Sequence, residues 1–220
     1  PWILWPTIHT GSNFEEHKLF NLNDYYKLNK LQIWEILISK KINVAAISPM
    51  NAKDNFDEKS IYLPDPWSKN KAKGTFLIEF LRDTCSYFVN NNAGKKNILK
   101  YFNLLVCFIF FARFRNYYSY VNFFFKSITK KWYQTIFFDL LLFDFFYKFI
   151  NRKYEFVSIF LNGAAHIQHH YLFNSKENVS SIKNPDWYID KNSDPIFDIY
   201  KSYDKKIGDI LKNVDLYNNR

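Results

Sequence analysis

Glycine and cysteine are both rare in this chain of 220 residues, which contains 5 glycines and 2 cysteines. Cys85 and Cys107 are too few for a disulfide framework or for a metal site built from thiolates. We therefore expect two buried thiols, because a free cysteine usually behaves as a small core residue. No internal repeat is present, and no recognised nucleic-acid motif accompanies the basic residues, so nucleic acid is not an expected partner.

Acidic residues are missing from one long segment, residues 84–138, although the chain carries 21 of them. The same segment holds much of the net charge of +9. Its basic residues are Lys95, Lys96, Lys100, Arg113, Arg115, Lys126, Lys130 and Lys131. A segment of one charge sign with many aromatic residues could attract an anionic membrane surface or a phosphate-rich partner. The alternative is a set of helices with basic, solvated faces.

Long apolar runs are also absent. The most apolar run, Leu104–Ala112, has nine residues before Arg113, well short of the roughly 20 that cross a bilayer as a helix. A second apolar stretch, residues 137–149, is interrupted by Asp139 and Asp144. We therefore expect helices rather than membrane spans in this part of the chain.

Hydrophobic residues make up 48% of the chain and aromatic residues 21%, enough to bury a core. Residues 32–40 have helical periodicity and precede the apolar, β-branched run 42–47, which is the αβ order of a parallel sheet. A second strand is expected over 154–161, with a helix starting near Ala164. The other expectations are a loop entering a helix over 1–18, a polar loop over 51–74, helices over 75–150, a loop over 174–194 and a helix over 195–213.

These patterns predict an α/β fold with a partial parallel-sheet core and a helical insertion. The expected parts are an N-terminal core segment (1–74), an aromatic, basic, helical insertion (75–150) and a continuation of the core (151–220).

Three of the five histidines fall within five residues, at His166, His169 and His170. On a helix, offsets of three and four place side chains on one face. They follow an expected central strand, and open α/β sheets bind ligands beyond the carboxyl ends of their strands. Imidazole is a common ligand of zinc and related metals, and Asn162 at the strand end could add an oxygen. The alternative is three polar surface residues of a helix.

Hydroxyl groups near the N-terminus form a second candidate site. Thr7 and Thr10 precede an expected helix that contains Glu15, Glu16 and His17. A hydroxyl beside a helix start suits a nucleophile that faces an anionic ester. Helix capping is the ordinary alternative for such residues.

Several motifs, taken in order, resemble those of one family. Thr10-Gly11 followed by Glu15-Glu16-His17 resembles the TG-x-x-P-E-E-H-G stretch of type I phosphodiesterases and nucleotide pyrophosphatases, in the alkaline phosphatase superfamily. Further similar segments are Ile33 to Ala46, the Pro64-Asp65-Pro66-Trp67 loop, Phe160 to Tyr171, and Asp198 to Leu211. The resemblance covers both ends of the chain and leaves the aromatic middle as an insertion.

The resemblance implies an alkaline phosphatase-like α/β fold that hydrolyses small or lipid-linked phosphate or sulfate esters. It also implies a divalent metal, usually zinc in a two-metal site, and a threonine, serine or modified cysteine nucleophile. By position His166 matches the histidine ligand, while Asn162 stands where the family has aspartate. His169 and His170 are the residues that could compensate for that departure.

The expected nucleophile position falls on Pro1, so the nucleophile either precedes this chain or has shifted to Thr7. The family's first aspartate ligand and its later Asp-His pair and final histidine have no counterpart here. We therefore expect a piece of a metal-dependent hydrolase. The alternatives are a binding module for an anionic membrane or polyanion through residues 84–138, and a catalytically degenerate member of the superfamily.

Overall fold

The structure is a computed structural model that describes residues 2–91, 97–150 and 153–212. It has mixed α/β character and divides into two compact units. The first unit comprises residues 1–112 and 144–160, and the second comprises 113–143 and 161–220. The expected mixed α/β fold is confirmed at this level.

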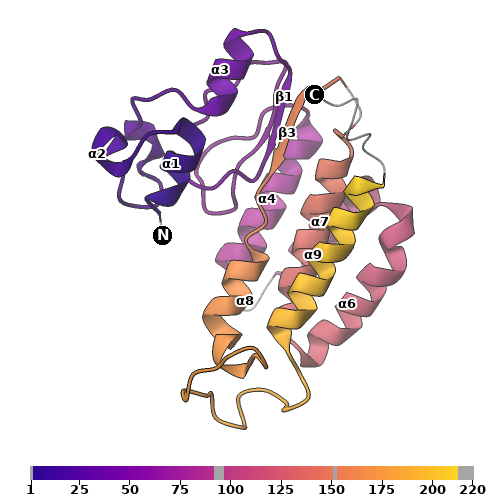
Figure 1. Ribbon diagram of the computed structural model, residues 1–220. Coiled ribbons are helices and arrows are strands. Elements are labelled where there is room, and N and C mark those ends of the chain that lie inside the picture. Colours follow the sequence, from indigo (N-terminus) through magenta and orange to yellow (C-terminus); the bar gives the residue numbers. More distant parts are fainter. Residues whose placement is uncertain (1, 92–96, 151–152, 213–220) are drawn as a thin grey trace. The chain divides into compact units, whose positions relative to one another are not determined.

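The first unit contains a three-stranded parallel sheet with the order β2-β1-β3, of which Figure 1 labels β1 and β3. The strands are β1 (Val44–Ile47), β2 (Ile61–Leu63) and β3 (Phe156–Ile159). Every residue of β1 is buried, as expected for a central parallel strand of apolar residues. The register aligns Ala45 with both Ile61 and Val157.

Two expectations about these strands need correction. Within the described residues β3 pairs only with β1, so it is an edge strand and not the expected central one. Its residues are only half-buried. The expected loop over 51–74 contains β2, whose three residues lie between polar segments and are too few to show a period in the sequence.

A cluster of aromatic and small residues packs beside β1 in the first unit. Helix α3 (Ile33–Ser39) supplies Trp34, which stacks on Phe56 with ring centroids 5.3 Å apart. Phe56 stacks in turn on Tyr62 of β2 at 4.3 Å. The start of α3 is held by Glu35, whose carboxylate accepts from Gln32 N at 2.9 Å.

The N-terminal segment is more helical than expected. Instead of a loop entering one helix, it forms α1 (Leu4–Thr10) and α2 (Phe14–His17). Pro6 obscures α1 in the sequence, but it lies in the first turn, where backbone N–H groups have no partner within the helix. Gly11 ends α1 with a left-handed φ of 69°, a conformation that glycine adopts without strain.

The rest of the first unit is helical, as expected for residues 75–150. Helix α4 (Phe76–Asn90) packs against α5 (Ile98–Phe111), and a 3₁₀ turn, η1, covers Asp24–Lys27. Cys85 and Cys107 are free and buried, which confirms their prediction as core thiols. Lys95 and Lys96 of the basic segment lie outside the described residues.

The second unit is built from helices. They are α6 (Tyr117–Thr129), α7 (Trp132–Tyr147), α8 (Gly163–Tyr171) and α9 (Pro195–Leu211), with 3₁₀ turns η2 (Phe114–Asn116) and η3 (Leu172–Asn174). Helix α7 continues past residue 143 into the first unit. Helices α8 and α9 begin and end close to the expected positions, although residue 213 lies outside the described part of the chain.

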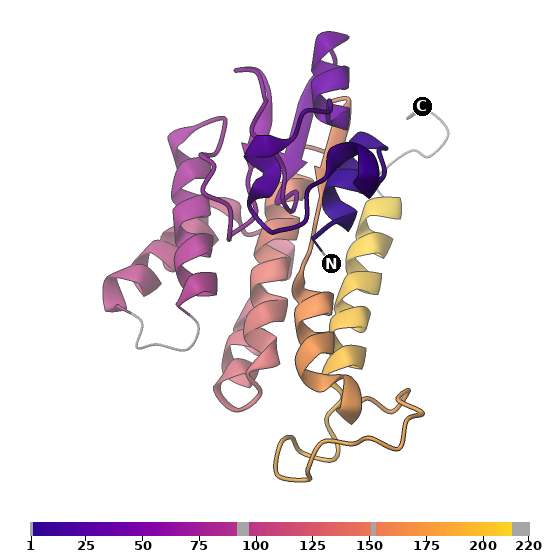
Figure 2. The same cartoon turned by 90° about the vertical axis from the view of Figure 1, so that its left-hand side faces the viewer.

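Helices α8 and α9 lie side by side in the second unit (Figure 2). Their apolar faces close a core with the start of α7. Its buried members are Trp132, Tyr133, Ile136, Ile167, Ile189, Ile196 and Ile199. This packing fixes the face of α8 that carries Ile167, and it therefore also fixes the directions of the histidines on the other faces. Among the described residues, no helix combines the length and apolar character that a membrane crossing requires.

Candidate functional site

Asp139 and Tyr203 hold the start of helix α8 in place. The chain enters α8 through Asn162 and Gly163. Gly163 N donates to the Asp139 carboxylate at 3.1 Å, and Ala164 N donates to the Tyr203 hydroxyl at 3.2 Å. A negative charge at this position also stabilises the helix dipole. These contacts explain why α8 starts where it does.

The close approach of Asp139 requires a glycine at position 163. A Cβ atom on Gly163 would lie 2.1 Å from Asp139 Oδ2, far inside van der Waals contact. The nearby carboxylate therefore leaves no room for any side chain at position 163. In the sequence, Asp139 served only as evidence against a membrane span. Its structural role could have been suspected because it is a carboxylate within an otherwise apolar stretch.

Asp139 has an altered acidity in this buried setting. Burial raises the pKa of its carboxyl from 3.8 to about 6. The hydrogen bond from Tyr203, the charge of Lys206 and the hydrogen bond from Gly163 N each act to lower this pKa. Tyr203 donates to Asp139 Oδ2 at 2.5 Å. Burial and the neighbouring carboxylate raise the pKa of Tyr203 in turn. Both groups serve to position α8.

The three clustered histidines differ in their surroundings. His166 is half-buried, whereas His169 and His170 are exposed. The rings of His166 and His170 meet edge to face, with centroids 4.8 Å apart. This is the pair one helical turn apart, and it is the closest ring contact within the cluster.

The His166–His170 pair is chemically suited to bind a cation. Burial lowers the pKa of His166, and the neighbouring His170 and His169 lower it further. At neutral pH its ring is therefore uncharged and offers a nitrogen lone pair, the form in which imidazole binds a metal. In the described part of the chain, no hydrogen bond occupies the ring nitrogens of His166, His169 or His170.

Asn162 stands at the N-cap of α8. Its backbone carbonyl accepts from His166 N at 3.0 Å, but its side chain makes no capping hydrogen bond. The amide is thus not used for the ordinary structural role of an asparagine at a helix start. The first N–H groups of α8 are already bound to Asp139 and Tyr203, so an anion cannot use them. The side chains left for a ligand at this helix are the imidazoles and the Asn162 amide.

The imidazole pair alone is not a complete metal centre. Over residues 2–91, 97–150 and 153–212, no group of three or more histidine, cysteine, aspartate or glutamate side chains is arranged to hold a metal ion. The rings of His166 and His170 fit two ligand positions of a tetrahedral zinc site, which needs further donors.

Thr7 lies in the first unit and its hydroxyl has two partners. Thr7 Oγ1 donates to Ile3 O at 3.2 Å and lies 3.0 Å from His17 Nε2. Because Leu19 N donates to His17 Nδ1 at 3.0 Å, the neutral ring carries its proton on Nε2 and donates it to Thr7. In this state His17 orients the hydroxyl but does not take its proton.

The Thr10 hydroxyl also has two partners, and both are backbone groups. It donates to Pro6 O at 2.7 Å and accepts from Ser12 N at 3.1 Å. These are local bonds that help α1 to end at Gly11. Thr7 and Thr10 belong to the first unit, while Asn162, His166, His169 and His170 belong to the second, so the structure groups the six residues into two separate sets.

Two buried polar groups that sequence reasoning did not single out stabilise the first unit. His9 Nε2 lies 2.8 Å from Met50 O, which ties α1 to the segment after β1. Asp65, in the Pro64–Trp67 loop, accepts from Trp67 N, Ser68 N and Asn51 N. Burial raises the pKa of Asp65 to about 6, against those hydrogen bonds. The loop is therefore organised around a buried carboxylate.

Comparisons with known proteins do not add a family to this description. No family model, no curated protein and no solved structure matches the chain.

Proposed function

We propose that this chain contributes to a metal-dependent hydrolase of phosphate or sulfate esters, with His166 and His170 as ligands of a divalent metal, zinc in the first instance. The observation that carries the proposal is the imidazole pair on α8, whose rings meet at 4.8 Å and whose nitrogens are unoccupied in the described residues. The lowered pKa of His166 keeps that ring neutral near pH 7.

The parts of this chain have separate tasks in the proposed reaction. His166 and His170 hold the metal, and the Asn162 amide adds an oxygen donor at the start of α8. A bound zinc ion would supply Lewis-acid polarisation of the ester oxygen. Asp139 and Tyr203 keep the first turn of α8 in register, so that the imidazoles present their nitrogens together.

Thr7 is the better of the two nucleophile candidates, and Thr10 is the weaker. Thr7 Oγ1 is oriented by the imidazole Nε2–H of His17, whereas both partners of Thr10 are backbone groups near the end of α1. Because His17 acts as a donor here, it does not take the Thr7 proton in this state. The proposed substrate class is a small or lipid-linked phosphate ester.

The test compares three single variants on one helix. Zinc affinity is measured by isothermal titration and hydrolysis with bis(p-nitrophenyl) phosphate, in the longest natural form of the protein. We expect His166→Ala and His170→Ala to lower zinc affinity on the order of 100-fold and to abolish turnover. His169→Ala is the matched control, because its exposed ring lacks the contact that joins His166 and His170. Unchanged affinity in both ligand variants would contradict the proposal.

A second candidate function, docking on an anionic membrane surface, is favoured by an exposed apolar face on η2 and α6. The side chains follow a spacing of four and three residues and are between 53% and 85% exposed. They are Phe114, Tyr118, Val121, Phe125 and Ile128. They belong to the segment 84–138, which contains no acidic residue. An amphipathic face of this kind with nearby lysines suits the interface of an anionic bilayer.

This second function is tested by co-sedimentation with vesicles of phosphatidylserine and of phosphatidylcholine. We expect salt-sensitive binding to the first kind only, and loss of most of it in Phe125→Ser. Phe197→Ser on α9 is the control, since Phe125 and Phe197 are equally exposed, at 63% and 62%. Equal binding to both vesicles, or an equal effect of both variants, would contradict the membrane proposal.

A further inference from the structure

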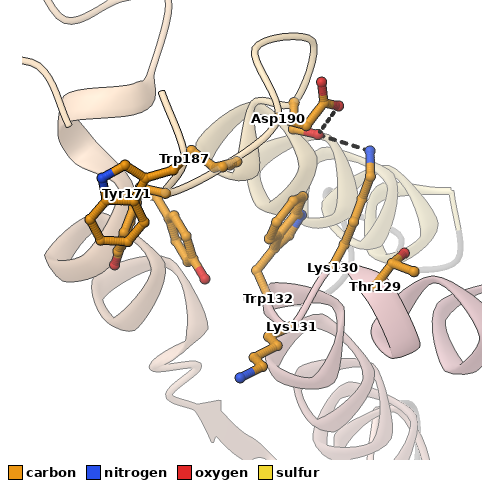
Figure 3. A pocket seen from close by; sticks show the side chains of 10 residues that line it. Thr129, Lys130, Lys131, Trp132, Tyr171, Trp187 and Asp190 are labelled. Atoms are coloured by element: carbon orange, nitrogen blue, oxygen red, sulfur yellow. Dashed lines mark hydrogen bonds between the residues drawn. The ribbon is translucent and has the colours of Figure 1, made fainter. Parts of the chain in front are cut away.

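A pocket of about 620 Å³ lies in the second unit, and none of the three clustered histidines is among its lining residues (Figure 3). Its walls come from three segments: the turn between α6 and α7, the end of α8, and the loop before α9. A volume of this size accommodates a ligand of one or two rings. The proposed hydrolase and membrane functions make no use of this pocket.

Four aromatic rings form a continuous wall along the pocket. The centroid distances are 5.5 Å from Trp132 to Tyr171, 5.7 Å from Tyr171 to Tyr188, and 6.0 Å from Tyr188 to Trp187. Trp132 is 6% exposed and belongs to the core, whereas Trp187 is 82% exposed. An indole left so open at the edge of a pocket offers a large apolar face to a ligand.

Three polar residues of the pocket form a hydrogen-bonded chain in which a serine joins a lysine to an aspartate. Lys130 Nζ donates to Ser193 Oγ at 2.9 Å, and Ser193 Oγ donates to Asp190 Oδ2 at 3.1 Å (Figure 3). Lys130 has three donor hydrogens, and a carboxylate can accept several hydrogen bonds. The network therefore presents both a donor and an acceptor to a ligand.

The aromatic wall and the oppositely charged residues of the pocket favour some classes of ligand and disfavour others. A free phosphate would meet the carboxylate of Asp190 beside Lys130, which opposes its binding. A quaternary ammonium would be repelled by two lysines, and Lys130 Nζ already lies 5.7 Å from the centre of the Trp132 ring. A neutral ring with hydroxyl groups around its edge and C–H bonds on its faces fits both the aromatic wall and the paired charges.

We propose that this pocket binds a pyranose sugar, with its C–H face against the aromatic wall and its hydroxyl groups on Lys130 and Asp190. Trp187 supplies the open stacking surface, and Trp132 closes the inner end. The Lys130–Ser193–Asp190 chain sets which ring hydroxyls donate and which accept. The site is independent of the metal proposal, so either can fail without the other.

The experiment is saturation-transfer difference NMR on the whole chain, with the methyl glycosides of glucose, mannose, galactose and N-acetylglucosamine as separate probes. We expect transfer to the axial C–H protons of at least one pyranoside. Trp187→Ala should remove most of that signal without unfolding the protein, because the indole is exposed. Lys130→Met should weaken binding at least fivefold while leaving the aromatic wall in place.

Trp2→Ala is the matched control, since Trp2 is a partly exposed tryptophan of the first unit. It should leave the transfer unchanged. Choline and inorganic phosphate serve as competing probes. The proposal is overturned if none of the pyranosides receives saturation, if Trp187→Ala leaves the signal intact, or if choline or phosphate displaces the sugar stoichiometrically.

Discussion

At the scale of single residues, one buried carboxylate determines much of the candidate site. Asp139 accepts from Gly163 N and from Tyr203, and so sets the first turn of the helix that carries the histidines. Its neighbours Gly163 and Tyr203 are far from it in sequence, so no local pattern could predict the contact. The sequence did predict that His166 and His170 share a face, because helical spacing alone determines it.

Two glycine substitutions test this close approach. Gly163→Ala should lower the free energy of unfolding by about 1–3 kcal/mol, because its Cβ would overlap Asp139 Oδ2. Gly208→Ala is the control: nothing lies within 4 Å of its Cβ position in α9, so alanine should raise stability by roughly 0.5–1 kcal/mol. Urea denaturation measures both, and equal effects of the two changes would contradict the assigned contact.

The raised pKa of Asp139 predicts how stability depends on pH. The folded protein holds the Asp139 proton up to about pH 6, whereas an unfolded aspartate loses it near 3.8. The contribution of this group to stability is therefore complete below about pH 4 and is lost as the pH rises towards 6 and beyond. Asp139→Asn removes that dependence and keeps an acceptor for Gly163 N.

The difference in unfolding free energy between wild type and Asp139→Asn should accordingly fall between pH 4 and pH 7. Asp65 has a similarly raised pKa, but it is present in both proteins and cancels in the difference. Denaturant titrations at several pH values provide the measurement. A difference that stays flat or grows with pH would show that Asp139 is not a buried acid of this kind.

At the scale of elements, sequence patterns predicted some elements and missed others. The apolar run of β1 and the helix α9 were both identified from their patterns. Strand β2 has three residues and α1 contains Pro6, so neither shows a recognisable period. The position of β3 at the sheet edge depends on pairing with β1, which a sequence pattern does not reveal.

Helix α9 offers a test of how its start is held. Asp194 accepts from Phe197 N at 3.0 Å, and Pro195 occupies the first turn. Asp194→Ala should cost about 1 kcal/mol, the usual value of an N-cap. The urea midpoint is the measurement. Asp194→Asn should recover most of the loss, and a failure to do so would mean that the side chain acts in another way.

At the scale of the whole molecule, the mixed α/β character was predictable from the sequence, but the grouping of the candidate residues was not. The sequence placed Thr7 and Thr10 near one helix start and His166, His169 and His170 on another. The structure assigns these two sets to different compact units. It also adds a pocket of about 620 Å³ whose walls come from three separate segments, which meet only when the chain is folded.

The central claim is that His166 and His170 bind one divalent metal, and zinc K-edge X-ray absorption tests it most directly. The fine structure of a zinc-loaded sample reports how many imidazoles surround the ion. We predict a loss of one imidazole from the zinc shell in His166→Ala and again in His170→Ala, with no change in His169→Ala. Zinc shells that are identical in all four proteins would contradict the account.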